Sequence, residues 1–121
     1  MLAHVVLFRP KRTITDADRE AMFAALHVAA RDIPSVRRFV VGSRVRHNAG
    51  YEALMTADFP FAAVMEFDDL AGLQAYLNHP AHEQLATRFF AAFEEALMYD
   101  YELREGGDAR SQSANFSTPS A

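Results

Sequence analysis

Two segments of this chain, residues 2–9 (LAHVVLFR) and 58–67 (DFPFAAVMEF), have the β-branched and aromatic content of strands but do not alternate polar with apolar residues. Successive side chains of a strand point to opposite faces of its sheet. The first segment therefore divides its side chains between the faces, with His4, Val6 and Phe8 on one and Val5 and Leu7 on the other. An antiparallel sheet with one solvated face alternates, so both faces of this sheet are expected to be buried.

The remaining segments complete a βαββαβ order. The predicted elements are strands at 2–9, 36–45, 58–67 and 96–103 and helices at 16–33, 70–78 and 81–96. This order is that of α+β proteins with a ferredoxin-like fold, in which a four-stranded antiparallel sheet carries its helices on one face. Because helices cover one face only, the apolar second face predicts a homodimer in which two copies pack through their sheet faces.

Composition and charge exclude several classes of protein. With 121 residues, half of them hydrophobic, the chain is expected to form one domain at 1–104, followed by a flexible Ser- and Gly-rich tail at 105–121. The chain has no cysteine, which excludes disulfides and thiolate metal sites. Its net charge is −4 and its 12 basic residues are scattered, so no nucleic acid binding is expected. The first apolar run is too short for a signal peptide or a membrane span, so a cytoplasmic protein is expected.

The segment LNHPAHEQL, residues 77–85, predicts a break between two helices. Proline disfavours the α conformation in the residue before it and suits the first turn of a helix, so His79 is expected to cap a helix that Pro80 begins. His82 then lies near the third helical position, where free N–H groups and the helix dipole disfavour the imidazolium. Glu83 would act in the opposite direction, which leaves the direction of the shift in the pKa of His82 open.

This corner contains two candidates for chemistry. A neutral His82 is suited to act as a general base, and Tyr76 across the corner is suited to orient the ring or a substrate carbonyl. Alternatively, the two side chains hold the corner together by hydrogen bonds. The spacing of His79 and His82 across a helix break is not the i, i+4 arrangement of zinc-binding helices, so no metal is expected. His4, a lone histidine among apolar strand residues, is either a binding residue or a core residue.

Four stretches resemble the Dabb family, also called the stress-responsive A/B barrel domain: HVVLF near the start, IPSV with the following FVVG, MEFDD, and LQAYLNHPAHEQL. The resemblance spans residues 2–103, and its most specific part is AYLNHPAH. It implies a ferredoxin-like protomer whose sheet pairs face to face with a second copy to form a dimeric α+β barrel. That expectation agrees with the burial predicted for the second face of the sheet.

The chain is similar, within this family, to the plant polyketide cyclase that makes olivetolic acid, an enzyme that folds a linear tetraketide without cofactor or metal. By position, the resemblance implies that His82 is the base, with Tyr76 and His4 beside the substrate. Two polar pocket positions of that enzyme fall on Phe61 and Leu26 here. The resemblance therefore implies a less polar substrate pocket that includes these two residues.

The sequence thus leads to one principal function and two alternatives. The principal hypothesis is a cofactor-free cyclase or lyase in which His82 abstracts a proton next to the carbonyl of a small, apolar, polyketide-like substrate. The first alternative is a non-enzymatic dimeric module that binds an apolar small molecule or acts in the stress response, which the apolar Phe61 and Leu26 favour. The second alternative, a monooxygenase, rests on analogy of fold alone.

Overall fold

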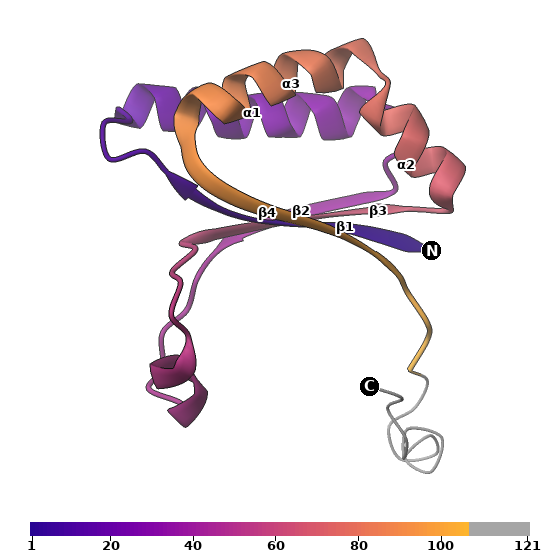
Figure 1. Ribbon diagram of the computed structural model, residues 1–121. Coiled ribbons are helices and arrows are strands. Elements are labelled where there is room, and N and C mark those ends of the chain that lie inside the picture. The colour runs from indigo at the N-terminus through magenta and orange to yellow at the C-terminus, as the bar shows by residue number, and fades with distance from the viewer. Residues whose placement is uncertain (107–121) are drawn as a thin grey trace.

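The computed structural model describes residues 1–106 and contains a four-stranded antiparallel sheet with the strand order β2-β3-β1-β4 (Figure 1). The strands are β1 (Leu2–Pro10), β2 (Arg38–Ser43), β3 (Phe61–Phe67) and β4 (Phe93–Glu102). The helices are α1 (Asp16–Asp32), α2 (Leu70–Leu77) and α3 (Pro80–Ala92), with a short 3-10 helix, η1 (Gly50–Leu54), between β2 and β3. The predicted ferredoxin-like fold is confirmed. The tail predicted at 105–121 lies outside the described residues after Gly106.

The helices α1, α2 and α3 lie together on one side of the sheet (Figure 1). Thr15 caps α1 by accepting a hydrogen bond from the backbone N–H of Asp18 at 3.1 Å, and Asp69 caps α2 by accepting one from Gly72 at 2.9 Å. The buried residues of α1 recur at helical spacing and are Met22, Leu26 and Ala29. One stripe of α1 therefore packs against the sheet. Within residues 1–106, no helix is both long enough and apolar enough to cross a membrane.

The core between sheet and helices is centred on Phe8 of β1. This side chain is 0% exposed, and the rings of Phe93, Phe89, Phe61 and Phe23 have centroids 4.7, 5.5, 5.6 and 6.4 Å from its own. Aromatic pairs at such separations stabilise a fold beyond the area that they bury. His4, Val6 and Phe8, which the alternation of β1 placed together on one face, are buried on the side of the sheet that carries the helices.

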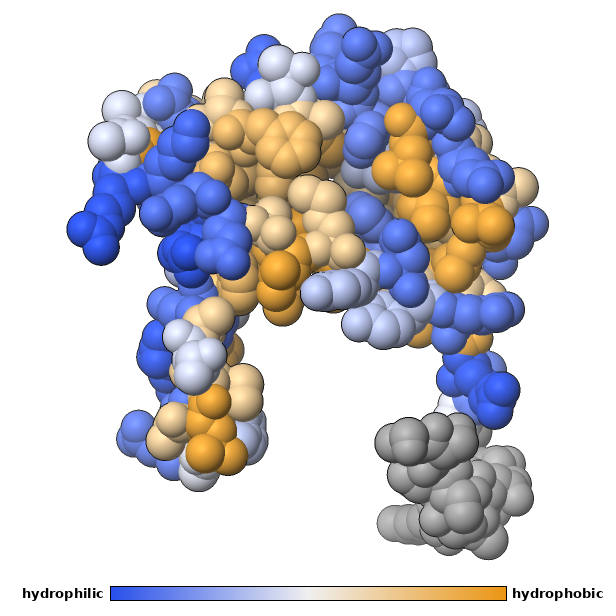
Figure 2. Space-filling view, viewed as in Figure 1, coloured by the Kyte–Doolittle hydropathy of each residue, from blue (hydrophilic) through white to orange (hydrophobic). Residues whose placement is uncertain are grey.

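The opposite face of the sheet is open within the described part of the chain. Register places a continuous apolar set on this face: Val5, Leu7, Val40, Val64, Leu97, Tyr99 and Tyr101. The segment that contains η1 extends from the sheet on the same side, so the molecule is an arch with its hollow beneath the sheet (Figures 1 and 2). The lack of polar and apolar alternation in the strand sequences is therefore explained by a second apolar face of the sheet, which the helices do not cover.

The last helix is shorter than predicted. Apolar residues at every fourth position predicted a helix as far as residue 96, but α3 ends at Ala92 and β4 begins at Phe93. The reason is pairing with β1, because Glu95 lies opposite Arg9 and the Arg9 guanidinium donates to the carboxylates of Glu94 and Glu95. Strand pairing here overrides the local helical pattern. The second and third strands are also shorter than predicted.

Candidate functional site

The corner between α2 and α3 is built by local hydrogen bonds around a His-Pro step. His79 is the N-cap of α3, and its Nδ1 accepts a hydrogen bond from the backbone N–H of Ala81 at 3.0 Å. Pro80 occupies the first helical turn. The backbone N–H of His79 donates to the Tyr76 carbonyl at 3.2 Å, and that of His82 donates to the His79 carbonyl at 2.9 Å. The predicted capping role of His79 is confirmed, and the corner brings Tyr76 and His82 onto adjoining turns.

The rings of Tyr76 and His82 contact each other across this corner. Their centroids are 4.7 Å apart and their planes meet at 68°, an edge-to-face arrangement. Tyr76 is buried and His82 is half-buried. The sequence-based expectation that Tyr76 lies across the corner from His82 agrees with this geometry.

Strand register adds a carboxylate beside the third predicted site residue, His4. His4 of β1 lies opposite Asp100 of β4, and His4 Nδ1 is 2.6 Å from Asp100 Oδ1. Because a carboxylate accepts the hydrogen bond, Nδ1 carries a proton and the orientation of the ring is fixed. The His4 ring is 6.0 Å from that of Tyr76. His4, Tyr76 and His82 therefore form a row from the sheet to the corner.

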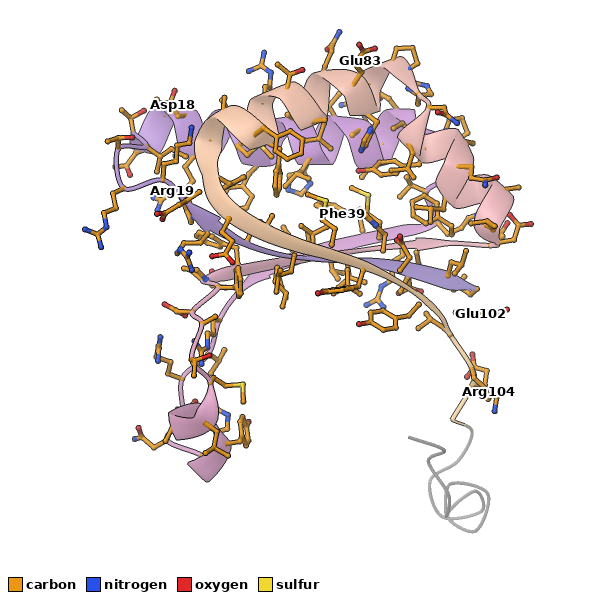
Figure 3. The ribbon with its side chains drawn as sticks, in the orientation of Figure 1. Asp18, Arg19, Phe39, Glu83, Glu102 and Arg104 are labelled. Carbon is orange, nitrogen blue, oxygen red and sulfur yellow. The ribbon has the colours of Figure 1, made fainter. Side chains whose placement is uncertain are left out.

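This row of rings borders a cavity of about 130 Å³ between the sheet and the helices. Its other walls come from β1, β3, α1 and α3 and include Val6, Ala63, Met65, Leu26, Leu85 and Phe89. Side chains from both layers fill the space around it (Figure 3). Apart from the three rings, every lining side chain is apolar, which is the usual character of a small-molecule site. In the described part of the chain, no three His, Asp or Glu side chains form a cluster that could hold a metal ion.

The surroundings of the corner lower the pKa of His82. Burial is the largest cause, the nearby His4 acts in the same direction, and a hydrogen bond with the backbone of Leu77 acts against them. Glu83, which the sequence suggested as an opposing influence, is exposed and points away from the sheet (Figure 3). Burial also raises the pKa of Tyr76 to about 12. At neutral pH the site therefore holds a neutral imidazole beside a protonated phenol.

Of the two apolar residues expected in the pocket, the structure places only Leu26 there. Leu26 is buried and lines the cavity. Phe61 does not line it, and this expectation is corrected: Ala63 and Met65 supply the β3 wall. The reason is register, because Met65 lies opposite His4 whereas Phe61 lies four residues away along β3, about 13 Å at the usual rise of a strand. Phe61 instead packs against Phe8.

Asp100 is the main site residue that sequence reasoning missed. The alternation of YDYEL placed Asp100 and Tyr99 on opposite faces of the last strand, but it did not indicate which face carries the helices. The pairing of β4 with β1 decides that question, since it sets Asp100 opposite His4. The lining residue Met98 was also missed, because strand periodicity identifies a face but not its position along a cavity.

The sequence profile of the stress responsive A/B barrel domain, Dabb, matches residues 2–103. The chain belongs to the Dabb family. No curated protein matches its sequence.

Three solved structures show how widely this Dabb fold is shared. A dimeric ferredoxin-like protein of unknown function from Thermobifida fusca is 24% identical, with a TM-score of 0.68 over 84% of this chain and 90% of that one. The hydroxynitrile lyase from Passiflora edulis is 21% identical, with a TM-score of 0.72 over 86% and 94%. The cofactor-independent oxygenase SnoaB from Streptomyces nogalater is 17% identical, with a TM-score of 0.63 over 86% and 93%. At these identities the likeness establishes the fold.

Proposed function

We propose that this Dabb protein is an enzyme of the cyclase or lyase type that acts on a small apolar carbonyl compound and needs only its own side chains for the reaction. The observation that carries the proposal is the contact between buried Tyr76 and half-buried His82 at the edge of a cavity that is apolar apart from these two rings and His4. The resemblance to plant polyketide cyclases supports this class of reaction. Its fold, shared with a hydroxynitrile lyase, is consistent with it.

In the proposed step, the neutral imidazole of His82 takes a proton from the carbon next to the carbonyl. The electron pair of that C–H bond forms the enolate, whose negative charge develops on the carbonyl oxygen. The Tyr76 hydroxyl donates a hydrogen bond to this oxygen and, with a pKa of about 12, keeps its own proton. In a cyclisation the enolate carbon then attacks a second carbonyl, whose π electrons become an alkoxide that takes the proton from the imidazolium. Without a second carbonyl, the enolate carbon regains that proton.

The remaining site residues receive supporting roles. His4 borders the cavity beside Tyr76, and its hydrogen bond to Asp100 holds the ring in one orientation. We assign to His4 a contact with the substrate and to Asp100 the role of a positioning residue that acts through His4. Leu26 supplies part of the apolar wall that excludes water from the reacting carbon.

An NMR titration of the histidine ring signals, with His82→Ala to assign one of them, tests this proposal. Because burial lowers the pKa of His82, its signal is expected to titrate below the ordinary value of about 6.5 and to shift when 2-butanone is added. The signals of His27 and His47, which lie outside the cavity, are internal controls for the ketone. A His82 midpoint at or above that value, together with no response to the ketone, would contradict the proposal.

A second candidate, a ligand-binding module without catalysis, is favoured by the apolar character of most of the wall. Leu26 and most of the other side chains around the cavity are apolar, so they offer no polar group to a reacting molecule. Binding of 2-butanone without any exchange of its α-protons would support the module, whereas protein-catalysed exchange would support the enzyme.

We also propose that the protein is a homodimer through the open face of its sheet. Two observations support this assembly: the continuous apolar set on that face, and the exposure of apolar residues on the adjoining η1 segment, where Leu54 is 74% exposed. A soluble monomer rarely leaves so extended an apolar surface in water. The Thermobifida fusca relative with the same fold is a dimer. In a two-fold symmetric dimer, a single interface would bury the open sheet faces of both copies.

A matched pair of valine variants tests the dimer. Val40 on the open face and Val28 on α1 are 42% and 41% exposed, so Val40→Lys and Val28→Lys make the same change at equal exposure. Light scattering at micromolar concentration is expected to give twice the chain mass of 13.5 kDa for the natural protein and Val28→Lys. Val40→Lys is expected to shift towards the single-chain mass, because the dimer would bury its ammonium group. A natural protein of single-chain mass would refute the proposal.

A further inference from the structure

The cavity opens through a rim of three exposed apolar side chains, Leu77 of α2, Phe90 of α3 and Met98 of β4, which we call the apolar rim. They line the cavity but are 42%, 68% and 44% exposed, whereas its deeper residues such as Val6 and Leu85 are buried. Figure 2 shows apolar side chains gathered between α3 and the strand β4 in front of it. The mouth of the cavity therefore lies between this helix and this strand.

The size of the cavity limits how much of a ligand can lie inside it, behind the apolar rim. A volume of about 130 Å³ is close to that of an apolar cavity that holds one benzene molecule, of roughly 150 Å³. Such a space accommodates a carbonyl group with a few carbon atoms beside Tyr76 and His82. Any larger ligand must pass between the rim residues, and the part that lies against them meets apolar carbon and sulfur atoms only.

We propose that the ligand is a carbonyl compound with an aliphatic tail, whose carbonyl lies inside the cavity and whose tail leaves it across Leu77, Phe90 and Met98. This inference rests on the proposed function and names its class of substrate. Phe90 determines tail specificity, because it is the most exposed of the three and offers the largest apolar surface to a tail. Phe90 lines the cavity and is 68% exposed, so its ring is accessible to a tail that leaves the cavity.

Two methyl ketones, 2-butanone and 2-nonanone, serve as the probes. Binding is followed by NMR through the His82 ring signals and the Met98 methyl signal. The affinity of the protein for a ketone is expected to rise about two- to fourfold for each added methylene group, because each group is transferred from water to the apolar rim. The Met98 methyl is expected to shift with 2-nonanone and much less with 2-butanone, while both ketones shift the His82 ring.

Variants of Phe90 distinguish a specific contact between the ketone tail and Phe90 from non-specific binding of the more hydrophobic ketone. Phe90→Ala is expected to lose most of the gain of 2-nonanone over 2-butanone, whereas Phe90→Leu keeps most of the gain. Leu70→Ala is the control, because Leu70 is exposed on α2 but lies outside the cavity. All these positions are exposed, so the variants are expected to fold.

The outcomes distinguish the two proposals. If 2-butanone shifts the His82 ring but 2-nonanone binds no more tightly, or if Phe90→Ala keeps the full gain, the tail site is refuted and the proposed function stands. If 2-nonanone shifts the Met98 methyl while neither ketone shifts the His82 ring, the carbonyl does not reach the corner, and both the enzyme and the tailed carbonyl ligand are refuted. If neither signal responds to either ketone, both proposals fail.

Discussion

We expect His82→Ala to lower the protein-catalysed exchange of deuterium into the carbon atoms beside the carbonyl of 2-butanone by about 10²- to 10⁴-fold, which is the usual contribution of a positioned general base. The reason is that the His82 ring contacts Tyr76 across the corner of α2 and α3 and lines the cavity, where a substrate carbonyl would lie. Exchange in deuterated buffer is followed by proton NMR, and the rate in buffer alone is subtracted.

The pH dependence of this rate has a definite sign. Burial places the pKa of His82 below its ordinary 6.5, so the imidazole is already neutral at pH 7. The rate is expected to fall as the pH is lowered through that depressed pKa, since protonation removes the base. Tyr76 keeps its proton up to a pKa of about 12 and causes no loss of rate at mildly alkaline pH.

Tyr76→Phe removes the hydrogen-bond donor and is expected to lower the rate by about 10²-fold or more.

His27→Ala is the matched control for this experiment. His27 is exposed on α1, where its ring packs against Phe39, and it does not line the cavity. Its loss is expected to leave the exchange rate unchanged. A His82→Ala protein that exchanges as fast as the natural one, or a natural protein no faster than buffer, would refute the role of His82 as a base.

Phe8→Ala is expected to lower the free energy of unfolding by about 3–5 kcal/mol, the range typical of a buried phenylalanine reduced to alanine. Phe8 is fully buried, and the rings of Phe93, Phe89 and Phe61 pack around it within 4.7 to 5.6 Å. Its removal leaves a cavity whose walls come from both layers, so neither the sheet nor the helices can close it alone. Urea denaturation at one protein concentration measures the effect, because dimerisation would make stability depend on concentration.

The same substitution at Phe90 is the control for stability. Phe90 is 68% exposed, so Phe90→Ala is expected to change the free energy of unfolding by less than about 1 kcal/mol. Equal losses for Phe8→Ala and Phe90→Ala would show that the aromatic cluster is not the centre of the core.

Features that depend on a few neighbouring residues were predictable from the sequence. His79 caps its helix as expected, because a side chain that bonds a backbone N–H two residues later needs no partner from elsewhere. The proximity of Tyr76 to His82 was also expected, since the proline between them leaves few geometries for the corner.

Features that depend on strand register were not predictable. Asp100 reaches His4, and Phe61 lies away from the cavity, because β1 pairs with β4 and β3 at particular offsets. Sequence spacing contains no information on these offsets, and a shift of one residue would move each side chain to the other face. The end of α3 at Ala92 has the same origin, since pairing with β1 extends β4 into a segment with a helical pattern.

The sequence by itself therefore determined the order of the elements, the helix starts, the His-Pro corner and the apolar character of both sheet faces, all of which follow from short-range propensity and periodicity. Only the tertiary structure decided which side chains meet. It set His4 against Asp100, closed the cavity with Met65 in place of Phe61, and placed Phe90 and Met98 at its mouth. The physical reason is that these contacts join residues far apart in the chain, and pairing between strands and packing between layers select them together.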